Sequence, residues 1–401
     1  MQQISSRRIA SILGMLGGIG PLAIDMYLPA MPQVAAKLNV GEGAVQFSLM
    51  SFFAGLMLGQ LFYGPLSDRY GRKRMIYVGL ALFVAASVGC MIAQTAGQLT
   101  AWRFAQGLGG SIGMVIGLAV VRDLYTGRTA ASLIALMMIV QGIAPIIAPM
   151  LGTAILTVAP WEALFAVLAL FGIVCLVLVA AFLPETRMQE LRATSRPIDA
   201  LRNYRHLLSS SRFIPYAAAL AFAQAGFFAY LAGSSFVFMR IHGLSPAVYS
   251  ILFALNAIGL MIGAQTAPRL MKYFRPVVII RTALGAYAAA AILLLLIELT
   301  GNAGLVPMSV LLFAVITAMA FVLPLANVLA LESYGAISGT AAALLNALQF
   351  AAGTLSTLIV GILADGTALP MVAAIAVSGT MALLVAILLL PGSSRGRLQT
   401  I

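Results

Sequence analysis

The sequence has few charged residues, and most of those are basic. Only 8% of its 401 residues are Asp, Glu, Lys or Arg, whereas 62% are hydrophobic, and its mean hydropathy is +1.04. Soluble globular domains are nearer to half apolar and about a quarter charged. This composition excludes a soluble protein and predicts a chain that lies largely within a lipid bilayer.

Residue types that catalysis and metal binding need are also scarce. The only histidines are His206 and His242, both in predicted loops, and the only cysteines, Cys90 and Cys175, fall inside apolar runs. These positions exclude a histidine relay or histidine metal site within the membrane, and we expect no disulfide. The chain lacks a Gly-Lys pair, and therefore the phosphate-binding loop of nucleotide hydrolases. We expect no enzymatic activity, no catalytic residues, no cofactor and no bound metal ion.

Long apolar runs fill most of the sequence. A helix needs about 20 apolar residues to cross the hydrocarbon core of a bilayer. We predict twelve such spans, with connections too short for a soluble catalytic domain. They lie at roughly 9–28, 45–66, 75–95, 99–121, 131–158, 162–183, 213–237, 246–268, 276–298, 304–328, 337–363 and 368–391. The first run has no clean cleavage site after it, so we expect an uncleaved helix and not a signal peptide.

Basic residues are unevenly distributed over the two sides of the predicted membrane. With the amino end inside, the outer loops hold only Lys37 and Arg240. The basic groups of the other loops and of the terminal segments lie on the cytoplasmic side, at 7–8, 69–74, 122–128, 187–212, 269–275 and 395–397, with Arg281 just inside a span on that side. Cytoplasmic loops of membrane proteins carry such an excess. We therefore place both termini in the cytoplasm, and the net charge of +12 orients the protein and does not indicate a nucleic-acid partner.

The longest polar stretch, residues 184–212, follows the sixth predicted span. It divides the chain into a six-helix bundle at 1–183, a cytoplasmic linker, and a second six-helix bundle at 213–401. Residues 267–275, APRLMKYFR, repeat the proline, basic residue, tyrosine and arginine of residues 64–72, GPLSDRYGR, about half a chain length later. This echo indicates duplication, so we expect an all-α membrane protein of two pseudo-symmetric bundles. The linker forms either a surface helix or a simple tether on the positive side.

The loop between the second and third spans reads Gly64-Pro-Leu-Ser-Asp-Arg-Tyr-Gly-Arg-Lys-Arg74. Its charge and its turn residues suit the edge of a membrane, where backbone and charge are exposed. The motif resembles the loop at this place in the major facilitator superfamily, a large class of secondary transporters with twelve helices. We expect Asp68, Arg69 and Arg72 to form a gating network that holds the two halves together on the cytoplasmic side, with Asp123 as a further member.

Asp25 is predicted to lie in the outer part of the first span. A carboxylate there costs on the order of several kcal/mol unless it faces a cavity or a partner, and burial favours its protonated form. We predict that Asp25 carries the coupling proton and also contacts a cationic substrate, together with Tyr27. The alternative is an aspartate at a helix end that the outer solvent reaches, because Pro29 follows closely.

Arg103 lies near the outer start of the fourth span, in Leu99-Thr-Ala-Trp-Arg-Phe-Ala-Gln-Gly107. This pattern resembles the fourth-helix motif of the superfamily, which is associated with proton coupling. The resemblance implies that Arg103 faces the cavity and responds to the charge on Asp25. The alternative is that its long side chain reaches back to the membrane interface.

The fifth span contains Gln141-Gly-Ile-Ala-Pro-Ile-Ile-Ala-Pro149, in which two prolines remove backbone donors and bend the helix. It resembles the fifth-helix motif of drug/proton antiporters, which favours export over uptake. In the second half the polar residues are sparse and neutral. We predict a substrate site that includes Gln141, Phe227, Asn256, Asn327 and Asn346, and ordinary helix packing is the alternative for each.

Asp25-Met-Tyr-Leu-Pro-Ala-Met-Pro32, taken with residues 64–74, resembles the bicyclomycin- and chloramphenicol-resistance (Bcr/CflA) branch of drug/proton antiporters. The resemblance implies a monomeric exporter of amphipathic drugs or related small molecules in the bacterial inner membrane, which works by alternating access with the proton as coupling ion. Some multidrug exporters carry a second acid where this chain has Gly17, so Asp25 is expected to be the only deep proton site. The alternatives are a proton-coupled uptake symporter for a small metabolite and a non-transporting membrane receptor.

Overall fold

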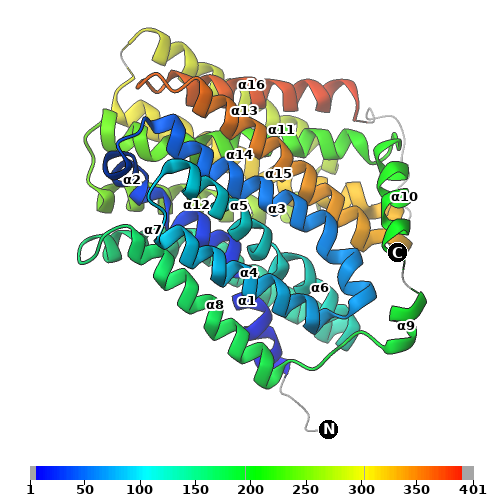
Figure 1. The fold of residues 1–401 in the computed structure, drawn as a ribbon. Coiled ribbons are helices and arrows are strands. Elements are labelled where there is room, and N and C mark those ends of the chain that lie inside the picture. Colours follow the sequence, from blue (N-terminus) through cyan, green and yellow to red (C-terminus); the bar gives the residue numbers. More distant parts are fainter. Residues whose placement is uncertain (1–5, 195, 302, 391–401) are drawn as a thin grey trace.

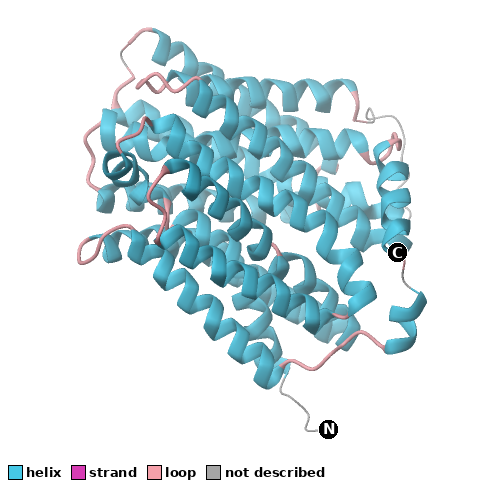
Figure 2. Cartoon of the chain, viewed as in Figure 1, coloured by secondary structure: helices cyan, strands magenta, loops and turns pink. Residues whose placement is uncertain are grey.

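The computed structural model describes residues 6–194, 196–301 and 303–390, and these residues form helices and loops without a strand (Figure 1, Figure 2). Twelve segments are long and apolar enough to cross a membrane. The prediction of an all-helical protein with twelve spans is therefore confirmed. Arg395 and Arg397 lie outside the described residues.

The first bundle contains six spans, built from eight α-helices and one short 3₁₀ helix. They are α1 (Ser6–Asp25), η1 (Leu28–Ala30), α2 (Met31–Leu38), α3 (Glu42–Tyr70), α4 (Arg72–Met91), α5 (Ala96–Gly110), α6 (Ile112–Leu124), α7 (Gly127–Leu156) and α8 (Glu162–Phe182). The predicted linker contains α9 (Gln189–Thr194) and α10 (Pro197–Leu208).

The second bundle also contains six spans. They are formed by α11 (Ile214–Phe236) with the π-helical turn η2 (Val237–Ile241), α12 (Pro246–Leu270), α13 (Pro276–Leu299), α14 (Leu305–Leu331) with the 3₁₀ turn η3 (Glu332–Ile337), α15 (Ser338–Ile362) and α16 (Leu369–Leu388). Spans of the two bundles meet along two pairs of helices, α3 against α15 and α7 against α12.

The first span is longer than predicted and is broken in the middle. It runs from Arg8 to Leu38, and its regular helix ends at Asp25. The break has a backbone cause, because Pro29 has no N–H to bond the Asp25 carbonyl, and the Tyr27 N–H turns to the Ile24 carbonyl instead. Broken helices at membrane depth are typical of transporter binding sites.

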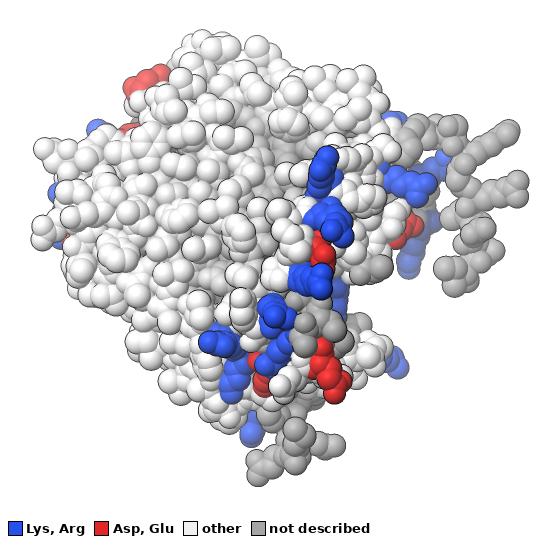
Figure 3. Space-filling view, turned by 45° about the vertical axis from the view of Figure 1, so that its right-hand side comes forward, with Lys and Arg blue, Asp and Glu red and all other residues white. Residues whose placement is uncertain are grey.

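Charged side chains gather mainly at one end of the molecule, around α9 and α10, while wide surfaces between the ends are free of charge (Figure 3). We call this the cytoplasmic end, following the distribution of basic residues. The opposite end, which carries Glu42 and Arg240, is called the outer end.

The two bundles are in close contact at the outer end. A Cβ built on Gly43 of α3 would lie 2.2 Å from the Gly361 carbonyl oxygen of α15, so the two main chains touch there. An ion pair of 2.9 Å also joins Glu42 to Arg240. Between α7 and α12, the Thr153 and Ser250 hydroxyls are 2.8 Å apart. We call these contacts the outer seal.

Candidate functional site

Asp25 lies at the break in the first span and is only 5% exposed. Turn η1, which follows it, packs against α11 and α12, so the break faces the second bundle. Tyr230 of α11 and Tyr249 of α12 are buried on the two helices against which η1 packs. The Asn256 amide donates a 2.9 Å hydrogen bond to the Tyr230 hydroxyl. Asp25 therefore lies at a helix end, as the alternative prediction from Pro29 proposed. Outer solvent does not reach it, however, because it is buried where the first bundle faces the second.

Arg103 is completely buried inside the first bundle. Its Nη1 donates to the Ala23 carbonyl at 3.1 Å and to Gln106 Oε1 at 2.6 Å. In an unbroken helix the Ala23 carbonyl would accept from Tyr27 N–H, so the arginine replaces a bond that the break removes. The side chain thus supports the backbone two residues before Asp25.

The rest of the Arg103 guanidinium lies among aromatic rings. It stacks 4.2 Å from the centre of Phe52 and 4.8 Å from that of Tyr27, and its Nε and Nη2 find no hydrogen-bond partner among the described residues. Neither interfacial snorkelling nor an Arg103–Asp25 ion pair is present in the described structure.

A continuous row of aromatic rings lines the boundary between the bundles beside this site. Neighbouring ring centres are 4.5–6.3 Å apart from α3 and α15 through α11 to α12, the range of favourable aromatic pairs. The row consists of Phe53, Phe350, Phe228, Phe227, Tyr230, Phe253 and Tyr249. The predicted residue Phe227 belongs to it, next to Tyr230.

The other predicted substrate residues are less closely grouped. Tyr27 is buried in the first bundle, where its hydroxyl is 2.9 Å from that of Ser48. The Gln141 amide of α7 lies over Gly17 of α1, where it takes up the space of a side chain.

Asn327 and Asn346 make their contacts within single helices. The Asn327 amide donates to the Leu323 carbonyl of α14 at 2.7 Å, and Asn346 Oδ1 accepts from Gln349 of α15 at 3.5 Å. No hydrogen bond between described residues joins either asparagine to Asp25. Their place in a substrate site stays a prediction.

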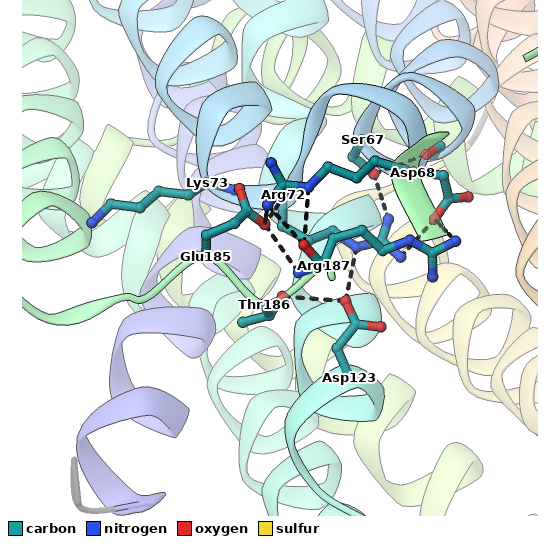
Figure 4. A network of polar contacts seen from close by, with 10 residues as sticks. Ser67, Asp68, Arg72, Lys73, Asp123, Glu185, Thr186 and Arg187 are labelled. Atoms are coloured by element: carbon teal, nitrogen blue, oxygen red, sulfur yellow. Dashed lines mark hydrogen bonds and ion pairs between the residues drawn. The ribbon is translucent and has the colours of Figure 1, made fainter. Parts of the chain in front are cut away.

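The predicted gating residues form a connected set of contacts at the cytoplasmic end (Figure 4). Arg72, with a side chain only 7% exposed, pairs with Asp68 at 2.7 Å and with Asp123 at 3.0 Å. Arg187, just after α8, lies 3.6 Å from Asp68. Arg69 donates to the Arg192 carbonyl at 3.1 Å. We call this set the cytoplasmic charge network.

Glu185 is a member of this network that the sequence reasoning did not single out. Its carboxylate accepts from the backbone N–H groups of Arg72 at 2.9 Å and Lys73 at 3.2 Å, which are the first free donors of α4 (Figure 4). An anion at a helix N-terminus is favoured by those donors and by the helix dipole. The available signal was a lone acid among arginines directly after a span, in Pro184-Glu-Thr-Arg187.

These ion pairs connect α3, α4 and α6 to the segment after α8. All of the partners named above lie between residues 67 and 192, and so in the first bundle and the linker. Facing the network across a cavity of about 440 Å³ are residues 337–343 at the start of α15, with α10 along one side. The expected ties from the network to the second bundle are not among these contacts.

Sequence comparisons place the chain among known transporters. The model of the Major Facilitator Superfamily matches residues 13–357. The uncharacterized MFS-type transporter YdgK of Bacillus subtilis is 36% identical over 366 residues, 90% of each chain. The bicyclomycin resistance protein homolog of Haemophilus influenzae is 29% identical over 92% of this chain and 93% of that protein. Multidrug resistance protein MdtL of Escherichia fergusonii is 32% identical over 68% and 69% of the two chains.

Solved structures show the same fold at low sequence identity. A D-xylose–proton symporter superposes with a TM-score of 0.73 at 18% identity and covers 96% of this chain and 97% of its own. An inward-facing, occupied bacterial homolog of the human lysosomal transporter Spinster gives 0.70 at 13% identity, over 97% and 95% of the two chains. With twelve spans and a family match over most of its length, this chain is a multi-pass membrane protein of the major facilitator superfamily and a transporter, not an enzyme.

Proposed function

We propose that this protein exports amphipathic drugs or related small molecules across the bacterial inner membrane in exchange for protons, by alternating access. The names of two relatives, a bicyclomycin resistance homolog and a multidrug resistance protein, support drug export. The observation that carries the proton part is the buried carboxyl group of Asp25 at the break of the first span. Both termini lie in the cytoplasm, the protein acts as a monomer, and it uses no cofactor.

Asp25 suits this role because it belongs to one bundle and faces the other. Deprotonation leaves a negative charge on the side of the first bundle that packs against α11 and α12, the helices that carry Tyr230, Tyr249 and Asn256, and we place the substrate at this boundary. The aromatic row offers apolar and π surfaces to the flat parts of an amphipathic substrate, and a cationic substrate gains the attraction of the carboxylate. Protonation removes that attraction and releases the substrate.

Arg103 gives the first bundle a response to this charge. Its guanidinium supports the Ala23 carbonyl, two residues before Asp25, and its Nε and Nη2 are buried without a hydrogen-bond partner among the described residues. When Asp25 loses its proton, the arginine is drawn toward the carboxylate, and the backbone at the break moves with it. The outer seal is closed in the present structure, so we assign this structure to the state that loads substrate from the cytoplasm.

Transport by purified protein in liposomes tests the proposal. With a pH gradient as the only energy source, the wild type should drive the movement of ethidium, a cation, and of chloramphenicol, which is neutral. Asp25→Asn should abolish both proton-driven movement and the proton release that follows substrate addition. Asp365→Asn, at an exposed carboxylate in the loop between α15 and α16, is the matched control and should transport normally.

Two outcomes would contradict the proposal. Transport that persists after the proton gradient is collapsed would show that protons do not drive it. Proton release of normal size from Asp25→Asn would move the coupling site elsewhere. Uptake of a metabolite together with a proton, without resistance to any drug, would favour the symporter alternative.

A further inference from the structure

Helix α10 of the linker crosses the cytoplasmic end of the molecule, transverse to the spans (Figure 1). It is amphipathic, because Ala200, Tyr204 and Leu207 are buried at one-turn intervals while its arginines face outward. The buried side packs against α3 of the first bundle and α15 of the second. The helix therefore lies across the boundary that must change when the bundles rock.

The carboxyl end of α10 is attached to the second bundle. It leads directly into α11 through Phe213, which is fully buried against the Tyr334 ring at 6.0 Å between ring centres. The Ser210 and Tyr334 hydroxyls are hydrogen-bonded, and the His206 ring lies 6.5 Å from the same tyrosine. Tyr334 belongs to η3, immediately before α15, so these contacts hold α10 to the second bundle.

A single polar contact between described residues joins α10 to the first bundle. The Tyr204 hydroxyl donates a 2.9 Å hydrogen bond to the backbone carbonyl of Leu61 in α3. That carbonyl is available because the residue four positions later is Pro65, which has no N–H to complete the helical bond. Burial raises the pKa of the Tyr204 hydroxyl to about 12, so the group keeps its proton and remains a donor at physiological pH.

We propose that Tyr204 is a positioning residue that holds α10 as a strap between the two bundles in the outer-closed state, by bonding the carbonyl that Pro65 leaves free. The strap borders the cavity between the cytoplasmic charge network and the start of α15. When the outer end opens, the cytoplasmic ends of the bundles must approach each other, and α10 can no longer keep its place against both. The hydrogen bond is then lost, so it favours the closed outer end.

Removing the hydroxyl should change the balance of the two states without removing the ring. One neutral hydrogen bond that exists in only one state corresponds to a change of about two- to tenfold in their ratio. Tyr204→Phe should lower the ratio of outer-closed to outer-open protein by that factor. Tyr273→Phe, at a tyrosine that is 78% exposed in another cytoplasmic loop, is the matched control and should leave the ratio unchanged.

Distances between paired spin labels in the purified full-length protein measure this ratio. Labels at positions 128 and 272 report on the cytoplasmic ends, and labels at 157 and 300 report on the outer ends. The Pro65→Ala background adds a second test, because it gives the Leu61 carbonyl a helical donor. In that background Tyr204→Phe should have a much smaller effect than in the wild type.

Two results would overturn the proposal that α10 acts as a strap. One is that wild type and Tyr204→Phe have equal distance distributions. The other is that Tyr204→Phe has the same effect in the Pro65→Ala background as in the wild type. The inference rests on the alternating-access cycle proposed above but on neither the substrate nor the coupling ion. A wild type with one unchanging distance at each end, with and without ethidium, would overturn that cycle and the strap together. A wild type with two populations and an inert Tyr204→Phe would overturn the strap alone.

Discussion

The turn at Gly71 allows a quantitative prediction. Gly71 joins α3 to α4 with φ of +100°, a conformation that residues with a side chain rarely adopt, and a Cβ there would lie 2.5 Å from Glu185 Oε2. In Gly71→Ala the backbone strain costs about 1–3 kcal/mol, because φ of +100° with ψ of 150° is a conformation that essentially only glycine adopts. The displaced carboxylate loses its bonds to the Arg72 and Lys73 N–H groups, which adds about 1–2 kcal/mol because the site is partly exposed. We expect a total destabilisation of about 2–5 kcal/mol.

The two free cysteines provide the assay. Cys90 and Cys175 are both buried in spans, so a thiol-reactive fluorescent dye labels them only as the protein unfolds in detergent. Gly71→Ala should unfold at a clearly lower temperature than the wild type. Gly285→Ala is the matched control, because no atom lies within 4 Å of the added Cβ and alanine is the better helix former by up to about 1 kcal/mol. If the two variants unfolded at the same temperature, neither the backbone strain at Gly71 nor the contact with Glu185 would contribute to stability by the stated amount.

Three further predictions concern switching and coupling. Asp68→Asn should slow the exchange between the outer-open and outer-closed states. Equilibrium binding of ethidium should stay within about twofold of wild type, because the lost ion pair with Arg72 is far from Asp25. Weaker binding at an unchanged exchange rate would place Asp68 in the substrate site instead. The lysine of Arg103→Lys cannot keep both the planar stacking on the aromatic rings and the hydrogen bond to the Ala23 carbonyl, so proton-coupled transport should fall at least tenfold. Transport by this variant at the wild-type rate would show that the contact from Arg103 to the Ala23 carbonyl is not needed for coupling. Glu42→Gln breaks the ion pair of the outer seal, which is open to solvent on the Arg240 side and worth about 1 kcal/mol, so spin labels should show an increase of about fivefold in the outer-open population. A decrease would contradict this prediction.

The number of spans could be predicted from the sequence because hydropathy alone determines which segments enter a bilayer. The helix end at Asp25 was foreseen only as an alternative, from Pro29. The continuation of the span beyond it could not be predicted, since the apolar run gives no sign of the local change of backbone hydrogen bonds at Tyr27. The hydrogen bond from Arg103 to the Ala23 carbonyl could not be predicted for the same reason, because the break leaves this main-chain carbonyl without its helical donor. Composition cannot identify such a partner.

The same limit applies to the linker. Its alternating charge allowed either a surface helix or a tether, and the structure shows α10 as the former. The contact from Tyr204 to Leu61 joins residues far apart in the chain, and depends on a proline that the sequence showed only as part of a loop motif. Asp68, Arg72 and Asp123 were correctly grouped, because a charged residue at a membrane edge must find a partner nearby. The connection to Glu185 required the path of the chain after α8.

The two ends of the protein differ in how salt will affect them. At the cytoplasmic end the contacts are ion pairs whose side chains are partly open to water, and salt weakens such partly exposed pairs. At the outer end Gly43 and Gly361 bring two main chains into van der Waals contact, and counterions cannot enter between them. A rise in cytoplasmic ionic strength would therefore loosen the hold of the first bundle on the segment after α8, while the packed helices at the outer end would stay unchanged.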